Sequence, residues 1–215
     1  MVSAISMKLS FCEATICSVC NGENESERFF SVQREVTMQS KINLVRATKK
    51  DVKMLHRLQV EAFLPLYEKY HDDDTNPAKE PEDKLRKKLE DINGDFYIIY
   101  NEDMPVGGVR VNYKKGNNDV VTGNVKWISP LFIIPEYQNR GIAQEALKQI
   151  FELYSDTISW RLYTIKQEAG NCHLYEKCGF VRVGEEKNIN DKMALIKYEK
   201  QTSYRGDFAG KMLKK

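Results

Sequence analysis

Hydrophobic and polar positions along the chain follow two different periods, and together they predict strands and helices from residue 41 onwards. Apolar residues at helical spacing predict four helices, which begin near Val52, Pro81, Ile142 and Asn171. Short runs of strand-forming residues predict strands over 42–47, 95–100, 105–113, a long segment ending at Pro135, 158–165, 180–183 and 193–198. The predicted order is β-α-α-β-β-β-α-β-α-β-β, an α/β fold with a mixed sheet.

Several local signals place turns and helix ends within this order. Thr48–Asp51 has the pattern of a capping box that opens the first helix. The polar segment 67–77 predicts a loop after that helix, and residues 115–119 predict a turn. Paired glycines at 107 and 108 predict a bulge or a close approach of two backbones. Gly179 closes the last helix, because a residue without a Cβ accepts the left-handed conformation.

Length and charge restrict the function classes. The chain has 215 residues, which suits one domain with extensions: an N-terminal extension (1–40), poorly ordered or loosely packed, a domain (41–200) and a basic tail (201–215). A net charge of +2 gives no support for a nucleic-acid partner. No stretch approaches the roughly 18 apolar residues of a membrane span, and residues 1–20 lack a clear signal-peptide pattern. We therefore expect a cytoplasmic protein with no membrane partner.

Five cysteines do not form a recognisable framework. They lie at positions 12, 17, 20, 172 and 178, and an odd, bunched count does not favour a set of disulfides. Cys12, Cys17 and Cys20 offer three thiolates, but a second pair at zinc-ligand spacing is missing. We expect no metal site.

The segment 131–143, LFIIPEYQNRGIA, carries the clearest candidate chemistry. An apolar run is stopped by Pro135, a polar turn ends at Gly141, and a helical pattern begins at once. Such a junction directs unpaired backbone N–H groups and the positive end of a helix dipole towards one point, which can bind a phosphate or pyrophosphate. The spacing Gln138-x-x-Gly141-x-Ala143 is neither the GxxxxGK[ST] of nucleotide triphosphatases nor the GxGxxG of dinucleotide folds.

Two motifs in sequence order resemble those of the GNAT N-acetyltransferase superfamily. The first is the Gln138–Ala143 spacing after a strand that ends in proline, and the second is Leu174-Tyr-Glu-Lys-Cys-Gly-Phe180, one helix and one strand later. The resemblance covers roughly residues 41–200. It implies a mixed, mostly antiparallel sheet flanked by helices on both faces, with splayed central strands. It also implies acetyl-coenzyme A as cosubstrate and direct transfer of the acetyl group to an amine.

The resemblance also implies how the cosubstrate is held. The loop amides would bind its pyrophosphate, and free backbone groups of the strand before the loop would pair with its pantetheine arm. A break at Ser129-Pro130 supports this, because proline cannot donate to a strand ladder. The expected cosubstrate-binding residues are Phe132, Ile133, Ile134, Gln138, Asn139, Arg140, Gly141, Ile142, Ala143, Asn171 and Tyr175.

Candidate catalytic groups follow from the same comparison. Tyr175 matches the family tyrosine that protonates the departing thiolate, although its position also suits a core residue. Glu168 stands where many relatives have asparagine, and it is either a general base or a residue with an altered hydrogen bond. The strand segment 127–129 offers no carboxylate in the place where some relatives carry the base. The aromatic and acidic segment 67–74 either attracts a cationic amine or forms a solvated turn.

These features predict an acetyl-coenzyme A-dependent N-acetyltransferase that acts on a primary amine of a small molecule or peptide. One alternative is a protein acetyltransferase for lysine or N-terminal amines, which a flat acceptor groove would favour. The other is a coenzyme A-binding module without catalysis, which the missing strand carboxylate favours. The sequence leaves open the identity of the acceptor and whether the chain forms a homodimer.

Overall fold

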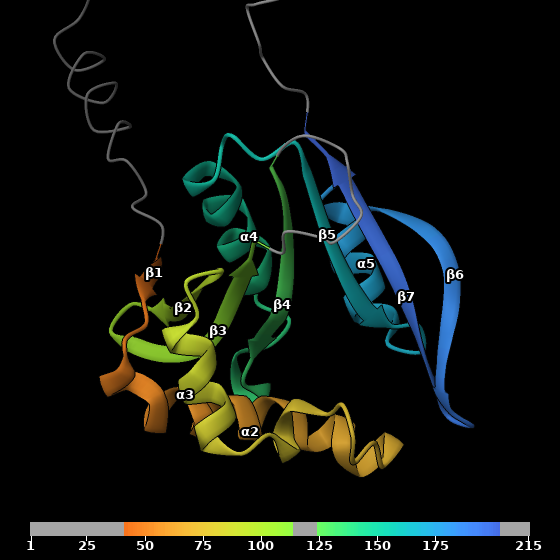
Figure 1. Cartoon of the computed structure of the whole chain (residues 1–215), viewed down its shortest axis with the longest axis horizontal. Helices are drawn as coiled ribbons and strands as arrows, with labels where there is room; N and C mark the ends of the chain where they lie inside the picture. Colours follow the sequence, from red (N-terminus) through yellow and green to blue (C-terminus); the bar gives the residue numbers. More distant parts are fainter. Residues whose placement is uncertain (1–40, 114–123, 203–215) are drawn as a thin grey trace, which may run out of the picture. The chain divides into compact units, whose positions relative to one another are not determined.

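The computed structural model describes residues 41–113 and 124–202. The predictions for residues 1–40 with their three cysteines, for 115–119 and for the tail beyond Thr202 lie outside the described residues. Helices and strands follow the predicted order (Figure 1). The elements are β1 (Ile42–Arg46), α2 (Val52–Tyr70), α3 (Glu82–Glu90), β2 (Gly94–Asn101), β3 (Met104–Asn112), β4 (Val125–Ile133), α4 (Ile142–Leu153), β5 (Ser159–Ile165), α5 (Ala169–Lys177), β6 (Val181–Asn190) and β7 (Met193–Gln201), with short 3₁₀ turns at Lys49–Asp51, Pro77–Lys79 and Pro135–Tyr137.

The strands form one mixed sheet in the order β1-β2-β3-β4-β5-β7-β6. Neighbouring strands are antiparallel at every pair except β4 and β5, which are parallel. The parallel pair follows from the connection through α4, because a strand, a helix and a second strand in succession return the chain in the same direction. The predicted mixed, mostly antiparallel sheet is confirmed.

The central strands β4 and β5 separate along their length. They pair at Val125, Lys126 and Trp127 of β4, whereas β4 remains paired with β3 as far as Ile133. The β3–β4 register shifts between Val109 and Val111, so that the Ser129-Pro130 dipeptide lies opposite one residue of β3. This bulge confirms the predicted break and lies just after Trp127, the last residue of β4 that pairs with β5 (Figure 1).

Two adjacent glycines allow β3 to approach β4 closely. A Cβ atom at Gly107 would lie 2.2 Å from the carbonyl oxygen of Phe132, a contact that a real side chain cannot make. A Cβ at Gly108 would lie 2.9 Å from ring atoms of both Phe96 and Phe132. The predicted close approach is confirmed at both positions.

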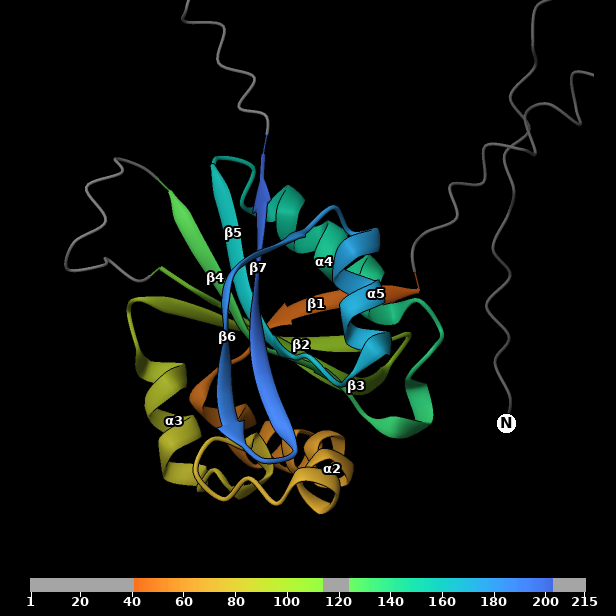
Figure 2. The same ribbon diagram turned by 90° about the vertical axis from the view of Figure 1, so that its right-hand side faces the viewer.

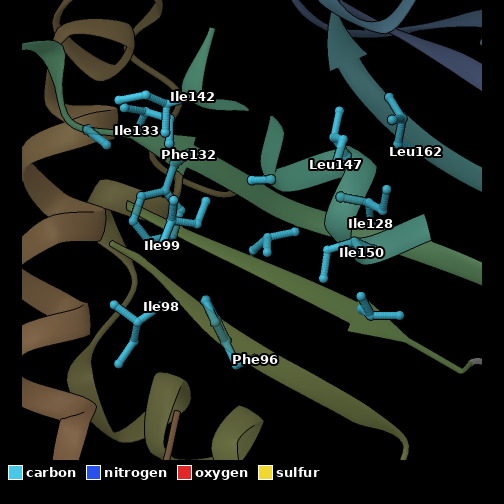
Figure 3. Packing of buried hydrophobic residues seen from close by; sticks show 14 of the residues in the cluster. Phe96, Ile98, Ile99, Ile128, Phe132, Ile133, Ile142, Leu147, Ile150 and Leu162 are labelled. Carbon is cyan, nitrogen blue, oxygen red and sulfur yellow. The ribbon is translucent and has the colours of Figure 1, made fainter. Parts of the chain in front are cut away.

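Helices cover both faces of the sheet. On one face, Leu55 of α2 is fully buried against Gly108 and Phe96. Asp95 and Phe96 are adjacent in β2, so their side chains point to opposite faces of the sheet. Asp95 accepts a hydrogen bond from the hydroxyl of Tyr154, at the end of α4, which places α4 on the other face. Figure 2 shows α4 and α5 grouped away from α2 and α3. Figure 3 shows Leu147 and Ile150 of α4 packing beside Ile128 of β4 and Leu162 of β5.

Two boundary predictions are wrong. Helix α2 continues through the first part of the predicted loop 67–77 and ends at Tyr70, where His71 adopts a left-handed conformation with φ 51°. The extension follows from burial, because Tyr70 is 4% exposed. Strand β6 runs to Asn190 and forms a long hairpin with β7 in place of a polar loop. As an edge strand with mostly exposed side chains, it lacks the apolar alternation that predicts a strand.

None of the helices within 41–113 and 124–202 has the length and apolar character that crossing a membrane requires.

The contact at Gly107 generates a stability prediction. Gly107→Ala should lower the free energy of unfolding by about 1–3 kcal/mol, because the added methyl group forces β3 away from β4. Urea denaturation monitored by tryptophan fluorescence measures this change. Gly170→Ala is the matched control, since a Cβ at this helical position meets no atom within 4 Å and should leave stability unchanged or raise it by up to about 1 kcal/mol. Equal stability of the two variants would contradict the close approach.

Candidate active site

A cleft of about 720 Å³ opens where β4 and β5 separate. Its walls come from the C-terminal half of α2, the end of β4 with the loop that follows, the first turn of α4, and α5. The structure brings most of the predicted site residues together along these walls. They are Phe132, Ile133, Gln138, Asn139, Gly141, Ile142, Ala143, Glu168, Asn171 and Tyr175.

The loop before α4 curves around the cleft. Asn139 and Gly141 both have left-handed backbone conformations, with φ values of 60° and 77°. Gly141 is the N-cap of α4 and provides no side chain that could satisfy the first N–H groups of the helix. The N–H of Gln138 instead donates to the carbonyl of Pro135 at 3.2 Å. The donors available to an anion therefore start at Asn139, one residue later than predicted.

Two side chains hold this loop in shape. The Gln138 amide donates from Nε2 to the carbonyl of Ile133 at 2.8 Å, which ties the loop to the end of β4. The Arg140 guanidinium donates to the carbonyl of Glu136 at 2.8 Å and lies over the ring of Tyr137. Arg140 is exposed and is not among the residues that line the cleft, so its side chain stabilises the loop from outside.

The backbone of β4 faces the cleft at alternate residues. Ile134 donates its N–H to the carbonyl of Val106 at 2.9 Å, and the carbonyl of Phe132 lies against Gly107. Both residues therefore pair towards β3, and the alternation of an antiparallel ladder turns the backbone of Leu131 and Ile133 towards the open side. Of the three predicted strand residues, Ile133 is placed to pair with a ligand. Leu131, which the sequence analysis missed, shares this orientation and lines the cleft.

Tyr175 is both a core residue and a cleft residue. It is 8% exposed, and its ring packs against Phe180 and Tyr198 with centroid distances of 5.9 and 6.1 Å. Its hydroxyl makes no hydrogen bond with any residue in the described part of the chain, although the side chain lines the cleft. Burial raises the pKa of Tyr175 above its ordinary value, so the phenol stays protonated and remains a hydrogen-bond donor at neutral pH.

Glu168 accepts two hydrogen bonds at one end of the cleft. Lys69 donates from Nζ to Oε1 at 2.7 Å, and the Tyr70 hydroxyl donates to the same oxygen at 2.5 Å. Burial tends to raise the pKa of Glu168, but these two hydrogen bonds and the positive charge of Lys69 outweigh it and lower the pKa. A carboxylate with a lowered pKa is a weak proton acceptor, so the geometry favours the altered hydrogen bond over the general base.

The acidic segment after α2 is compensated within itself. Asp72 accepts hydrogen bonds from the backbone of Asp74 and Thr75. Asp73 accepts one from the Tyr67 hydroxyl at 2.9 Å. None of the residues from Asp72 to Asp74 lines the cleft. Asp73 and Asp74 are exposed, as the predicted solvated turn requires, whereas Asp72 is buried and holds the turn through its hydrogen bonds.

The inner wall formed by α2 was not predicted. It consists of Ala62, Phe63, Pro65, Leu66 and Lys69. Ala62 and Phe63 continue the apolar helical spacing that begins at Val52, and this spacing is the signal that could have found the wall. Lys69 could not have been found in this way, because the predicted helix ended before it.

The comparisons with known proteins agree with this architecture. The model of the acetyltransferase (GNAT) family matches residues 53–180, more than half of the chain. The uncharacterized protein YrkN of Bacillus subtilis is 28% identical over 144 residues, which are 65% of this chain and 73% of YrkN.

Solved structures of acetyltransferases share the fold at low sequence identity. Spermidine N-acetyltransferase from Vibrio cholerae, in complex with CoA and spermine, has a TM-score of 0.60 and 19% identity and covers 77% of this chain and 98% of its own. An acetyltransferase from Salmonella typhimurium that modifies the N-terminal serine of ribosomal protein L7/L12 has a TM-score of 0.57 and 15% identity, covering 75% and 95%. With the split sheet and both motifs lining one cleft, the family match shows that the chain belongs to the GNAT acetyltransferase family.

Proposed function

We propose that the protein is an N-acetyltransferase that transfers the acetyl group of acetyl-coenzyme A to a primary amine of a small molecule or peptide. One observation carries this proposal: the open loop before α4, the side of β4 that faces away from β3 and the side chain of Tyr175 all line the same cleft. Each of these groups matches a different part of the cosubstrate.

The residues of the cleft suit acetyl-coenzyme A. Its pyrophosphate requires hydrogen-bond donors, which the backbone from Asn139 to Ala143 offers at the positive end of the α4 dipole. Its pantetheine arm carries amides, and the cleft-facing backbone of Leu131 and Ile133 can pair with them as an added strand does. The cleft volume of about 720 Å³ lies within the usual range of ligand sites.

Direct transfer follows from these positions. The uncharged amine attacks the thioester carbonyl and a tetrahedral intermediate forms. Its collapse breaks the C–S bond, releases the thiolate of coenzyme A and passes the extra proton of the nitrogen to water, which leaves the amide. Tyr175 is assigned the role of the acid that protonates the thiolate, because its hydroxyl is unpaired among the described residues and its pKa is raised. Glu168 is assigned a binding role, since its carboxylate is held by Lys69 and Tyr70.

The form of the cleft favours a small amine over a protein surface. The structural relatives do not decide this point, because one acts on spermidine and another on a ribosomal protein. In this chain, however, the Tyr70 hydroxyl and the Glu168 carboxylate join α2 to the start of α5 at one end of the cleft. A bridged end suits a short acceptor better than the flat groove required by a folded protein.

A panel of amines tests the proposal. Purified protein, acetyl-coenzyme A and one amine at a time are monitored by thiol release, with mass spectrometry of the product. We expect acetylation of at least one small primary amine. Binding of acetyl-coenzyme A without thiol release from any amine or peptide would instead identify a coenzyme A-binding module.

Substitution of Gly141 tests the loop. Gly141→Glu should weaken acetyl-coenzyme A binding by at least about 100-fold, because it places a negative charge among the donors for the pyrophosphate. Gly141→Asn is the matched control, since asparagine tolerates a positive φ and carries no charge. We expect this control to bind within a few-fold of the native protein in isothermal titration calorimetry. Undiminished binding by the Glu variant would contradict the assignment of this loop.

Substitution of Tyr175 tests the acid. Tyr175→Phe should lower kcat about 100-fold and leave the Kd of acetyl-coenzyme A nearly unchanged, because it removes a proton donor and preserves the packed ring. Tyr198→Phe serves as the control: this buried tyrosine packs against Tyr175, but its hydroxyl donates to Glu176 and it does not line the cleft. A kcat for the Tyr175 variant equal to that of the control would remove the acid role.

A further inference from the structure

A binding site for a cation lies at the α2 end of the cleft and is occupied by an ammonium group of the chain itself. Lys69 Nζ lies 2.7 Å from Glu168 Oε1 and 5.0 Å from the centroid of the Tyr70 ring. Carboxylates and aromatic faces both bind ammonium ions in proteins. Lys69 and Glu168 both line the cleft.

The ammonium group is the replaceable member of this arrangement. The Lys69 side chain is 55% exposed, compared with 23% for Glu168. It reaches the carboxylate on a long flexible stem, and ion pairs of this exposure are held weakly. A second ammonium group that enters the cleft can therefore take its place.

The carboxylate, in contrast, is fixed from several directions. The Tyr70 hydroxyl donates to it at 2.5 Å, and Tyr70 is itself buried, with its carbonyl accepting a hydrogen bond from Asn190 of the β6–β7 hairpin. The backbone carbonyl of Glu168 accepts hydrogen bonds from the N–H groups of Asn171 and Cys172 in α5. Glu168 thus has a preorganised position that does not depend on Lys69.

Glu168 and Tyr175 line the cleft at two different points along α5. Glu168 precedes the first residue of α5, and Tyr175 follows seven residues later. At the rise of an α-helix, their Cα atoms are separated by roughly 10 Å along the axis. An acceptor with two amines can therefore place one beside Tyr175 and the other at the Glu168 carboxylate.

We propose that Glu168 binds the second, non-reacting ammonium group of a diamine or polyamine acceptor, which displaces Lys69 Nζ from the carboxylate. This inference rests on the proposed acetyltransferase function and assigns the acceptor class to the same cleft. Lys69 is then an internal competitor of the acceptor, and the two residues have opposite effects on acceptor binding.

Matched pairs of a diamine and a monoamine distinguish binding of the second ammonium group by Glu168 from a general affinity for amines. Straight-chain diamines of four to eight carbons are each compared with the monoamine in which a methyl group replaces the second amine. For the native protein, we expect the kcat/KM of the best diamine to exceed that of its monoamine by about tenfold or more. Glu168→Gln should abolish this preference by raising the KM of the diamine about tenfold, so that the diamine loses its advantage over the monoamine.

Lys69→Met should change the diamine preference in the opposite direction. It removes the competing ammonium and keeps the apolar stem, so the KM of the diamine should fall by about threefold to tenfold. A decrease in the diamine kcat/KM of this variant would overturn the proposal, because it would mean that Lys69 supports the site.

The Lys166–Glu186 ion pair provides matched controls. Its N–O distance is 2.9 Å, and neither residue lines the cleft. Glu186→Gln and Lys166→Met change the net charge by the same amounts as the two test variants. Both controls should keep the native diamine preference. If Glu186→Gln lost the diamine preference as completely as Glu168→Gln, the preference would be a long-range effect of net charge, and the proposed site would be wrong.

Calorimetry separates failure of this inference from failure of the proposed function. The diamines are titrated into the native protein saturated with coenzyme A, a measurement that requires no turnover. Binding that is weakened about tenfold in Glu168→Gln and strengthened in Lys69→Met supports the recognition site even if no amine is acetylated. Acetylation without any diamine preference, or diamine binding that is equal in the native protein and Glu168→Gln, refutes it.

Discussion

The interrupted pairing between β4 and β5 is the constraint on which the rest of the site depends. Two parallel strands at the centre of a sheet normally satisfy each other's backbone groups, but here pairing stops after Trp127. The bulge at Ser129-Pro130 lets β4 bend. Because Gly107 has no side chain, β3 stays in close contact with the bent strand. The result is an unpaired strand edge inside the protein, where backbone groups require partners. A ligand that carries its own amides is one such partner.

The chemistry of the cleft between β4 and β5 depends on the packing that fixes the elements lining it. Ile142, Leu147 and Ile150 bury one face of α4, which fixes the first turn of the helix and aims its free N–H groups at the cleft. Burial acts on Tyr175 in a similar way, because the packing that holds its ring also keeps its phenol neutral. The proposed pyrophosphate site consists of backbone N–H groups rather than fixed cations.

The sequence predicted the parts of the fold that depend on neighbouring residues. The Thr48–Asp51 capping box, the stop at Pro135 and the left-handed Gly179 are local signals, and the structure contains all three. The contacts that were missed depend on distant residues. Tyr70 extends α2 because it is buried by tertiary packing, and Lys69 meets Glu168 across 99 positions of sequence. The direction in which Ile134 points its N–H depends on strand register, which no residue type specifies.

Glu168 stands at a position where the resemblance to the family implies asparagine, and a carboxylate there changes what this end of the cleft requires. An amide both donates and accepts hydrogen bonds, whereas an ionised carboxylate only accepts and brings a negative charge. The structure supplies Tyr70 as a buried, permanent donor and Lys69 as an exposed, mobile one. The Glu168 carboxylate accepts one hydrogen bond from a fixed group, Tyr70, and one from a replaceable group, Lys69. A ligand binds there by taking the place of Lys69. Selectivity at such a site is the difference between the affinities of two ammonium groups for one carboxylate.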